Sequence, residues 1–339
     1  KSVDGSRGLD FGGTVDFTFG TDAGIVQSAG LEYNAGHGPD SWGTGDYYSA
    51  IAQAYFETAY KKWNVKAGKF YAPFGSNGYQ STSRFFYSLA DTFAFVPATA
   101  AGAYATYTVN NKLSVYGGWV QPDQFGETAD DNAFLGGIIF QPTKKLNLHY
   151  AFAIGKNARE NQVHPLYNTI DKNDVNYFVN SLVATYQINK KWKYIFDWSL
   201  QNTNNDVDTQ KGDWGDEIYR TMNYGINNEL IYQYNSKWAF GVRAGWVHNG
   251  YSTRDADPDY KADGGYFDWA YTNKYTFSVG ANWTPTKWLL VKPELRYDVF
   301  DVTKFGNNDG SGSEQRQTPF DRGKNKDQFS GGISAIVKF

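Results

Sequence analysis

A short, positively charged turn recurs six times along the chain, and it is the feature that most limits how the chain can fold. Each copy ends in Lys followed by Trp or Leu, and the copies lie at residues 60–63, 110–113, 142–146, 189–192, 235–238 and 285–288. Apolar and polar residues alternate on both sides of each copy over about ten residues, the length of a tilted strand that crosses a bilayer. Each copy therefore predicts a tight hairpin between two membrane-crossing strands.

The alternation is explicit after the fourth turn. Trp192, Tyr194 and Phe196 share one parity, while Lys193 and Asp197 have the other. Because successive side chains of a strand point to opposite faces, this segment predicts one apolar and one polar face. The last segment, 327–339, alternates in the same way and ends in Phe339, which resembles the C-terminal assembly signal of outer-membrane barrels.

Six hairpins give twelve strands, and one strand at each end, 9–19 and 327–339, gives fourteen. No run of about 18 apolar residues exists for a transmembrane helix, and a closed barrel is the other way to satisfy the backbone in hydrocarbon. The sequence predicts an all-β fold: a single transmembrane antiparallel up-and-down β-barrel over residues 1–339, with 14 strands, short periplasmic turns and long external loops. An extra hairpin within residues 20–46 would give 16 strands, and this alternative stays open.

Composition fits this fold. Aromatic residues make up 18% of the chain although the mean hydropathy is -0.58, as expected where apolar residues form a lipid-facing belt and polar ones line the interior. The first residues carry no apolar targeting region, so we expect a mature form whose signal peptide was removed. A net charge of -3 argues against a nucleic-acid partner.

Charge also divides the two ends of the predicted barrel. The six turns hold nine lysines and no carboxylate, whereas the long segments 202–217, 250–265 and 306–317 are polar loops, acidic for example over 206–217. Aromatic rings and long cations suit a membrane interface. The predicted periplasmic girdle consists of Trp63, Trp192, Trp238 and Trp288.

Extending the alternation to every strand gives a charged lumen of both signs. The predicted pore-lining residues are Asp10, Asp16, Glu57, Lys66, Lys193, Asp197, Glu229, Arg243, Lys274, Lys292, Glu294, Arg296 and Asp298. A basic side chain that faced lipid at the midplane would cost about 2–4 kcal/mol, so we expect these residues to face water. They either meet the solute or form ion pairs that stiffen the wall, and both readings require a polar interior.

The segment 72–99 is too apolar for a solvated loop. We expect it to fold into the lumen as a constriction, with Arg84 as the charge at the narrowest point; packing on the rim or against another subunit is the alternative. The run Gly68-Lys69-Phe70-Tyr71-Ala72-Pro73-Phe74-Gly75 that leads into it, followed by an aromatic stretch, Pro97 and Gly102, resembles the OmpL-like β-barrel porin family. The resemblance implies an outer-membrane porin and supplies no catalytic residues.

These features predict a porin in the outer membrane of a Gram-negative bacterium, which allows passive diffusion of small polar solutes and ions. A substrate-selective channel, for example for sugars, remains an alternative because Tyr55, Phe70, Tyr104 and Tyr116 are predicted to point inward. A surface adhesin or scaffold is another. No enzyme, cofactor or metal site is expected, since of four histidines only His149 lies inside a predicted strand and no Ser–His pair points outward.

The expected partners are outer-membrane lipids, lipopolysaccharide and two further copies of the chain in a homotrimer. The row Ala50, Ala52 and Ala54 is the expected subunit contact, because its small side chains predict a smooth face.

Overall fold

The computed structural model describes residues 3–28, 30–32, 42–44, 47–123, 132–156, 175–206, 218–253, 272–302, 320 and 325–339. The strands are β1 (Asp10–Gly20), β2 (Gly43–Thr44), β3 (Tyr47–Tyr60), β4 (Trp63–Tyr71), β5 (Thr99–Asn110), β6 (Leu113–Pro122), β7 (Ala133–Thr143), β8 (Leu146–Lys156), β9 (Val175–Gln187), β10 (Trp192–Asp206), β11 (Ile218–Gln233), β12 (Trp238–Thr253), β13 (Thr272–Thr286), β14 (Leu289–Val302) and β15 (Asp327–Val337). Three short 3-10 helices are η1 (Gly5–Arg7), η2 (Thr21–Val26) and η3 (Asp91–Phe95). Among the described residues, no helix is long and apolar enough to cross a membrane.

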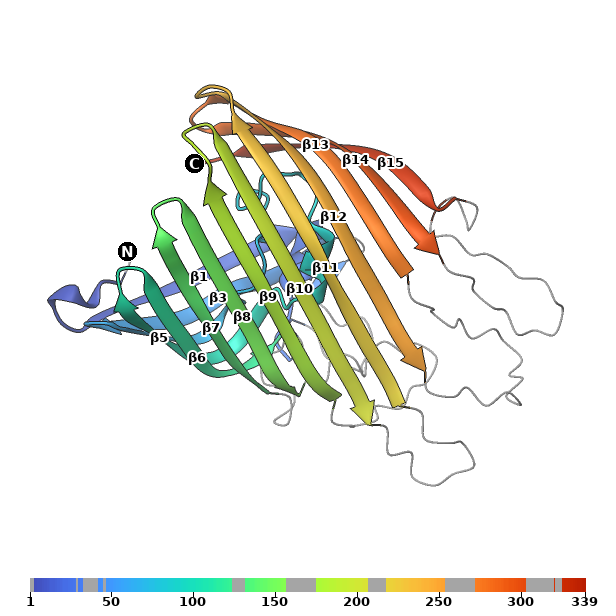
Figure 1. Ribbon diagram of the computed structural model, residues 1–339. Helices are drawn as coiled ribbons and strands as arrows, with labels where there is room; N and C mark the ends of the chain where they lie inside the picture. The colour runs from blue at the N-terminus through green and yellow to red at the C-terminus, as the bar shows by residue number, and fades with distance from the viewer. Residues whose placement is uncertain are drawn as a thin grey trace, which may run out of the picture. The chain divides into compact units, whose positions relative to one another are not determined.

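Strand order follows the chain from β1 through β3 to β15, and the paired strands are antiparallel (Figure 1). Within the described residues this path holds fourteen strands, which confirms the smaller predicted number. The two-residue β2 pairs only with the edge of β3, and η2 stands where the sixteen-strand alternative needed an extra hairpin. The chain divides into two compact units, unit 1 (residues 1–79 and 96–185) and unit 2 (residues 80–95 and 186–339).

All six predicted turns connect paired strands, and hydrogen bonds explain their recurring sequence. In unit 2, Oδ1 of Asn235 accepts from the backbone N–H groups of Lys237 and Trp238 at 2.8 and 2.9 Å. Asn189 does the same for Lys191 and Trp192. A side chain that bonds to the backbone two residues ahead closes the turn locally, so the polar residue before Lys fixes the hairpin.

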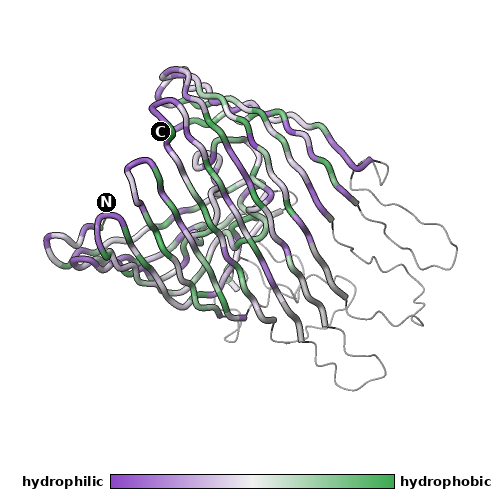
Figure 2. The backbone as a smooth tube through the Cα atoms, viewed as in Figure 1, coloured by the Kyte–Doolittle hydropathy of each residue, from purple (hydrophilic) through white to green (hydrophobic). Residues whose placement is uncertain are grey.

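Side chains alternate between an exposed apolar face and a covered polar face, the reverse of a soluble protein. In β1, Phe11, Val15 and Phe17 are exposed, with Val15 at 77%, while Thr14 and Asp16 between them are half-buried. The colours along the strands in Figure 2 change accordingly between neighbouring residues. An apolar outer surface of this kind is what a strand surrounded by lipid requires.

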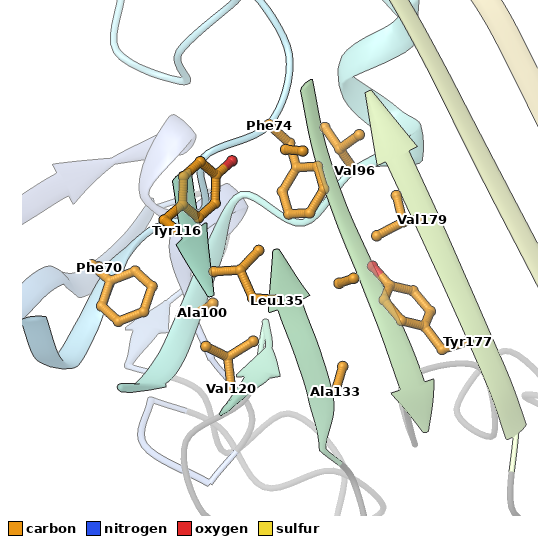
Figure 3. Close-up of a cluster of buried hydrophobic side chains, with 12 residues drawn as sticks. Phe70, Phe74, Val96, Ala100, Tyr116, Val120, Ala133, Leu135, Tyr177 and Val179 are labelled. Atoms are coloured by element: carbon orange, nitrogen blue, oxygen red, sulfur yellow. The ribbon is translucent and has the colours of Figure 1, made fainter. Parts of the chain in front are cut away.

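Unit 1 also carries an apolar cluster on its covered face. Phe74 and Val96, which flank the segment 80–95, pack there with Leu135 and Val179 over small residues such as Ala151 (Figure 3). The strands β5–β9 therefore have an apolar patch on the face that the sequence predicted to be mainly polar, although Phe70 and Tyr116 of this cluster were expected to point inward. Because its members are spread over strands far apart in the chain, no single segment revealed it.

The predicted subunit contact and the predicted long loops concern the surface of the protein. Ala50 and Ala52 are completely buried within the chain, so these two residues cannot form the predicted subunit contact, whereas Ala54 is half-buried. The long loops predicted at 202–217, 250–265 and 306–317 lie largely outside the described residues.

Candidate functional site: a charged wall and the segment that covers it

The polar face of unit 2 carries a ladder of charged and hydroxyl side chains on β12, β13 and β14. Along β14, Lys292, Glu294 and Asp298 are buried, while Leu295 and Tyr297 on the other face are exposed. The neighbours across the sheet continue the pattern. Arg243 on β12 is opposite Ser278 on β13, which is opposite Arg296 on β14. The period of two thus brings the predicted charges together on one wall.

The covering element is the segment 80–95, which ends in η3 and belongs to unit 2. Its Ser88 bridges two charges of the wall. The backbone N–H and the hydroxyl of Ser88 donate to Glu294 at 2.7 and 2.8 Å, and its carbonyl accepts from Nη1 of Arg243 at 3.0 Å. Arg243 and Glu294 form an ion pair of 2.7 Å, with side chains only 1% and 2% exposed. Buried charges need such pairing, since an isolated charge loses its hydration without compensation.

Asp91, the first residue of η3, makes the second attachment. Its Oδ1 accepts from Nζ of Lys274 at 2.7 Å and from Nη2 of Arg296 at 2.8 Å. Both cations also contact Asp298, at 3.2 and 2.8 Å, and the hydroxyl of Thr276 lies within hydrogen-bond distance of both carboxylates, with one proton to donate to either. Burial alone would raise the pKa of the Asp91 carboxyl, but Lys274 and Arg296 outweigh it and hold the pKa below its usual value. Asp91 is therefore an anion that binds the segment to the wall.

The charged groups at the attachments of Ser88 and Asp91 are equal in number for the two signs. Three cations (Arg243, Lys274 and Arg296) meet three carboxylates (Asp91, Glu294 and Asp298). The sequence left open whether the charged residues meet the solute or form ion pairs. These six residues form ion pairs, and one of the carboxylates, Asp91, comes from the segment rather than from the wall.

Three consecutive aromatic residues of the segment lie against three glycines of the wall. A Cβ on Gly241 would come within 2.4 Å of the Phe85 ring, one on Gly280 within 3.1 Å of Phe86, and one on Gly332 within 2.5 Å of Tyr87. Distances under 3.0 Å do not occur between a real Cβ and its neighbours. Glycine at these positions therefore lets the segment approach the sheet closely.

A matched pair of glycines in β15 tests whether the segment packs closely on the wall. We expect Gly332→Leu to displace Tyr87 and to destabilise the protein by about 1–3 kcal/mol, as overpacking generally does. Gly331→Leu is the control, since a Cβ there meets its nearest atom, Cδ2 of Leu295, at an ordinary 3.4 Å on the exposed face. The chain has no cysteine, so a single Cys at the buried Ala90 can report lifting of the segment by thiol labelling. Equal labelling in both leucine variants would contradict the packing of Tyr87 on Gly332.

Arg84 lies in the same segment, and its place as the charge at a constriction stays a prediction. Its Nε and Nη2 donate to the carbonyl of Tyr87 at 3.1 and 2.8 Å, so the guanidinium folds onto its own segment. Its carbonyl accepts from Nζ of Lys292 at 2.7 Å, and that ammonium also donates to the carbonyl of Ser81 at 2.7 Å. Lys292 thereby holds the start of the segment, as Asp91 holds its end.

The other predicted pore-lining residues lie on polar faces of the strands. In unit 2, Asp197 and Glu229 are buried and Lys193 is half-buried; Ser199 donates to Asp197 and Asn227 to Glu229. In unit 1, Asp10, Asp16, Glu57 and Lys66 are all half-buried. Nε2 of Gln53 donates to Asp16 at 2.6 Å, and Nδ2 of Asn64 donates to Glu57 at 2.7 Å.

One charged pair in unit 1 was missed by the sequence analysis. Lys69 occupies an odd position of β4, whereas Lys66 and Phe70 on the polar face occupy even ones. It therefore falls on the apolar face, where its partners across the sheet are Ala54 and Ala101. Its ammonium is fully buried and contacts both oxygens of Glu32 at 2.9 and 3.1 Å. Lys69 belongs to the glycine-containing run that carried the family resemblance, and its partner lies in a segment without periodicity.

The predicted girdle tryptophans occupy the turn ends of their strands. Trp63, Trp192 and Trp238 begin β4, β10 and β12, and Trp288 directly precedes β14. The Trp63 ring lies 4.7 Å from Tyr107, and Trp192 lies 4.6 Å from Tyr232. Phe339 is fully exposed. The interfacial role of the tryptophans and the assembly role of Phe339 stay predictions.

An antiparallel sheet with strands in chain order, an exposed apolar face and a charged opposite face defines an outer-membrane β-barrel. The family described as "Putative beta-barrel porin-2, OmpL-like" matches residues 2–339. The chain belongs to this family of porins, as the sequence resemblance indicated.

Several solved structures are similar to this chain at low sequence identity. OmpT, an outer membrane protein of Vibrio cholerae, is similar at 12% identity with a TM-score of 0.54, covering 86% of this chain and 81% of OmpT. An anion-selective porin from Comamonas acidovorans matches at 10% identity and a TM-score of 0.47, over 74% and 68% of the two chains. OprD from Pseudomonas aeruginosa matches at 13% identity and a TM-score of 0.40, over 86% and 82%. No curated protein matches the sequence.

Proposed function

We propose that this outer-membrane porin forms a water-filled pore for passive diffusion of small polar solutes and ions, and that the segment 80–95 narrows it. The observation that carries the proposal is the attachment of this segment to the charged wall through Ser88 and Asp91. Charged side chains on the wall need water or partners, which a lumen supplies. A segment fixed at both ends, by Lys292 and by Asp91, reduces the open cross-section permanently rather than acting as a mobile lid.

The balance of charge supports weak ion selectivity. Selectivity in pores generally comes from a ring of one sign, whereas the ion pairs of the wall and the segment join three cations to three carboxylates. Small neutral and ionic solutes would therefore pass according to size. A homotrimer and contact with lipopolysaccharide stay predictions, and a trimer would need a contact other than Ala50 and Ala52.

Planar-bilayer conductance tests the proposal. We expect stable single-channel steps in potassium chloride, with similar permeability for the cation and the anion. Neutral polyethylene glycols of increasing size should lower the conductance only while they are small enough to enter the pore. The absence of conductance from correctly folded, membrane-inserted protein would refute the diffusion proposal and leave the scaffold alternative.

A further inference from the structure

The polar face of unit 1 differs in chemistry from that of unit 2. Instead of buried ion pairs, it presents half-buried aromatic and polar side chains together on β3, β4 and β5. Glu57, Lys66 and Tyr104 are consecutive partners across these strands, and Tyr55 lies two residues before Glu57 on the same face. Side chains directly opposite one another in a sheet have Cβ atoms about 5 Å apart, so these four form one patch.

The charged groups of the patch are matched within it. Nζ of Lys66 lies 4.8 Å from the centre of the Tyr55 ring, and Asn64 donates to Glu57 at 2.7 Å. Lys66 and Glu57 contribute one charge of each sign, so the patch has no net charge. It offers both hydrogen-bond donors and acceptors.

Aromatic rings continue from this patch across the sheet. The Phe70 and Tyr104 rings are 4.9 Å apart, Tyr104 and Tyr116 are 5.9 Å apart, and the hydroxyl of Tyr116 lies 2.8 Å from Nε2 of His149. Phe70 and Tyr116 are buried in the cluster of Figure 3 and form the base. The half-buried Tyr55, Tyr104 and His149 are the accessible part.

Two glycines lie beside the half-buried rings of Tyr55 and Tyr104. Gly68 and Gly102 are paired across β4 and β5, two residues along from Lys66 and Tyr104, and Tyr55 is opposite Gly68. Both have positive φ, 130° and 149°, which L side chains rarely adopt. The sheet therefore has no side chains at these two positions beside the rings of Tyr55 and Tyr104.

From this arrangement we infer that the patch Tyr55, Glu57, Lys66 and Tyr104 is a binding subsite for neutral polyhydroxylated solutes, that is, sugars. The C–H faces of a sugar ring pack on aromatic rings, and its hydroxyls need donors and acceptors close by, as Glu57, Lys66 and the tyrosine hydroxyls provide. A neutral patch matches an uncharged solute. The inference rests on the proposed pore, since a solute must enter the lumen to reach this wall.

Current block by a linear glucose oligomer tests the subsite. In the unaltered protein we expect the oligomer to reduce the ion current saturably, and a polyethylene glycol of similar size to do so without saturation. Tyr55→Ala should weaken the block by about tenfold, equivalent to the loss of one aromatic contact. Phe56→Ala is the matched control, because Phe56 is the next residue on the exposed face.

The outcomes separate the subsite from the pore. Conductance without saturable block, or block that Tyr55→Ala leaves unchanged, would overturn the sugar subsite while the diffusion proposal stands. A protein without conductance would overturn the diffusion proposal itself. If Tyr55→Ala does not assemble, Tyr104→Leu carries the same expectation, because it removes the second accessible ring.

Discussion

Glu294→Ala is expected to release the segment 80–95 from the wall and to raise the single-channel conductance. The carboxylate accepts three hydrogen bonds, two from Ser88 and one from Arg243. Without it the Arg243 guanidinium, 2% exposed, remains as an uncompensated buried cation. Removal of one partner of a buried ion pair costs about 3–5 kcal/mol, so the segment should leave the wall to let water reach the arginine.

The measurements are conductance in planar bilayers and thiol labelling of a Cys at Ala90, combined with thermal unfolding in detergent. The double variant Arg243→Met with Glu294→Leu is the control, since it removes both charges and replaces them with apolar groups. We expect this control to restore most of the stability and yet to conduct more than the unaltered protein, because the contacts of Ser88 remain broken. Unchanged conductance in both variants would contradict a role of the segment as constriction.

Much of this arrangement could be predicted from the sequence, because a strand repeats every two residues. The parity of residues 289–298 placed Lys292, Glu294 and Arg296 on one face, and the repeated turns located the ends of the strands. The same rule placed Arg243 on the wall from its position in β12 alone. Local periodicity and turn chemistry are sufficient for these conclusions since both act between residues close in the chain.

The contacts of the segment 80–95 could not be predicted in this way. Ser88 lies 206 positions from Glu294 in the chain, and nothing in a run without periodicity indicates which side chain it meets. A signal was nevertheless present for Asp91, the only carboxylate between Glu57 and Asp123 in the sequence. A single acid in a long apolar stretch requires a cationic partner if it is buried. The residue predicted at the constriction was Arg84, whose guanidinium donates to the carbonyl of Tyr87 in the same segment, and this role stays a prediction.

The glycines of the wall show a second limit. Alternation assigns Gly241, Gly280 and Gly332 to the polar face, but a glycine in a strand gives no indication of what approaches it. The shared role of these three glycines, which lie on different strands, becomes visible only in the structure, where Phe85, Phe86 and Tyr87 pack on them. The same holds for Lys69, whose parity placed a cation on the apolar face without revealing that Glu32 covers it.

Lys69→Met is expected to destabilise the protein strongly without changing the conductance. Glu32 would keep its bonds from the backbone N–H groups of Ser28 and Ile51, at 2.7 and 2.9 Å, but would lose its ion pair with Lys69 while 1% exposed. The ammonium also donates to the carbonyl of Val26 at 2.9 Å, so the end of η2 loses an attachment as well. The expected loss is about 3–5 kcal/mol, as for other broken buried pairs.

Thermal unfolding in detergent, followed by the shift of the folded band on unheated gels, measures this loss. The control is Lys69→Met combined with Glu32→Gln, which removes both charges and should recover most of the lost stability. Because Lys69 lies on the apolar face of β4, neither variant should alter single-channel conductance. A conductance change in Lys69→Met at unaltered stability would contradict the assignment of this pair to the apolar face. Glu294→Ala and Lys69→Met thus distinguish two buried pairs of similar geometry by the face of the sheet on which each lies, since only the first is expected to change the flow of ions.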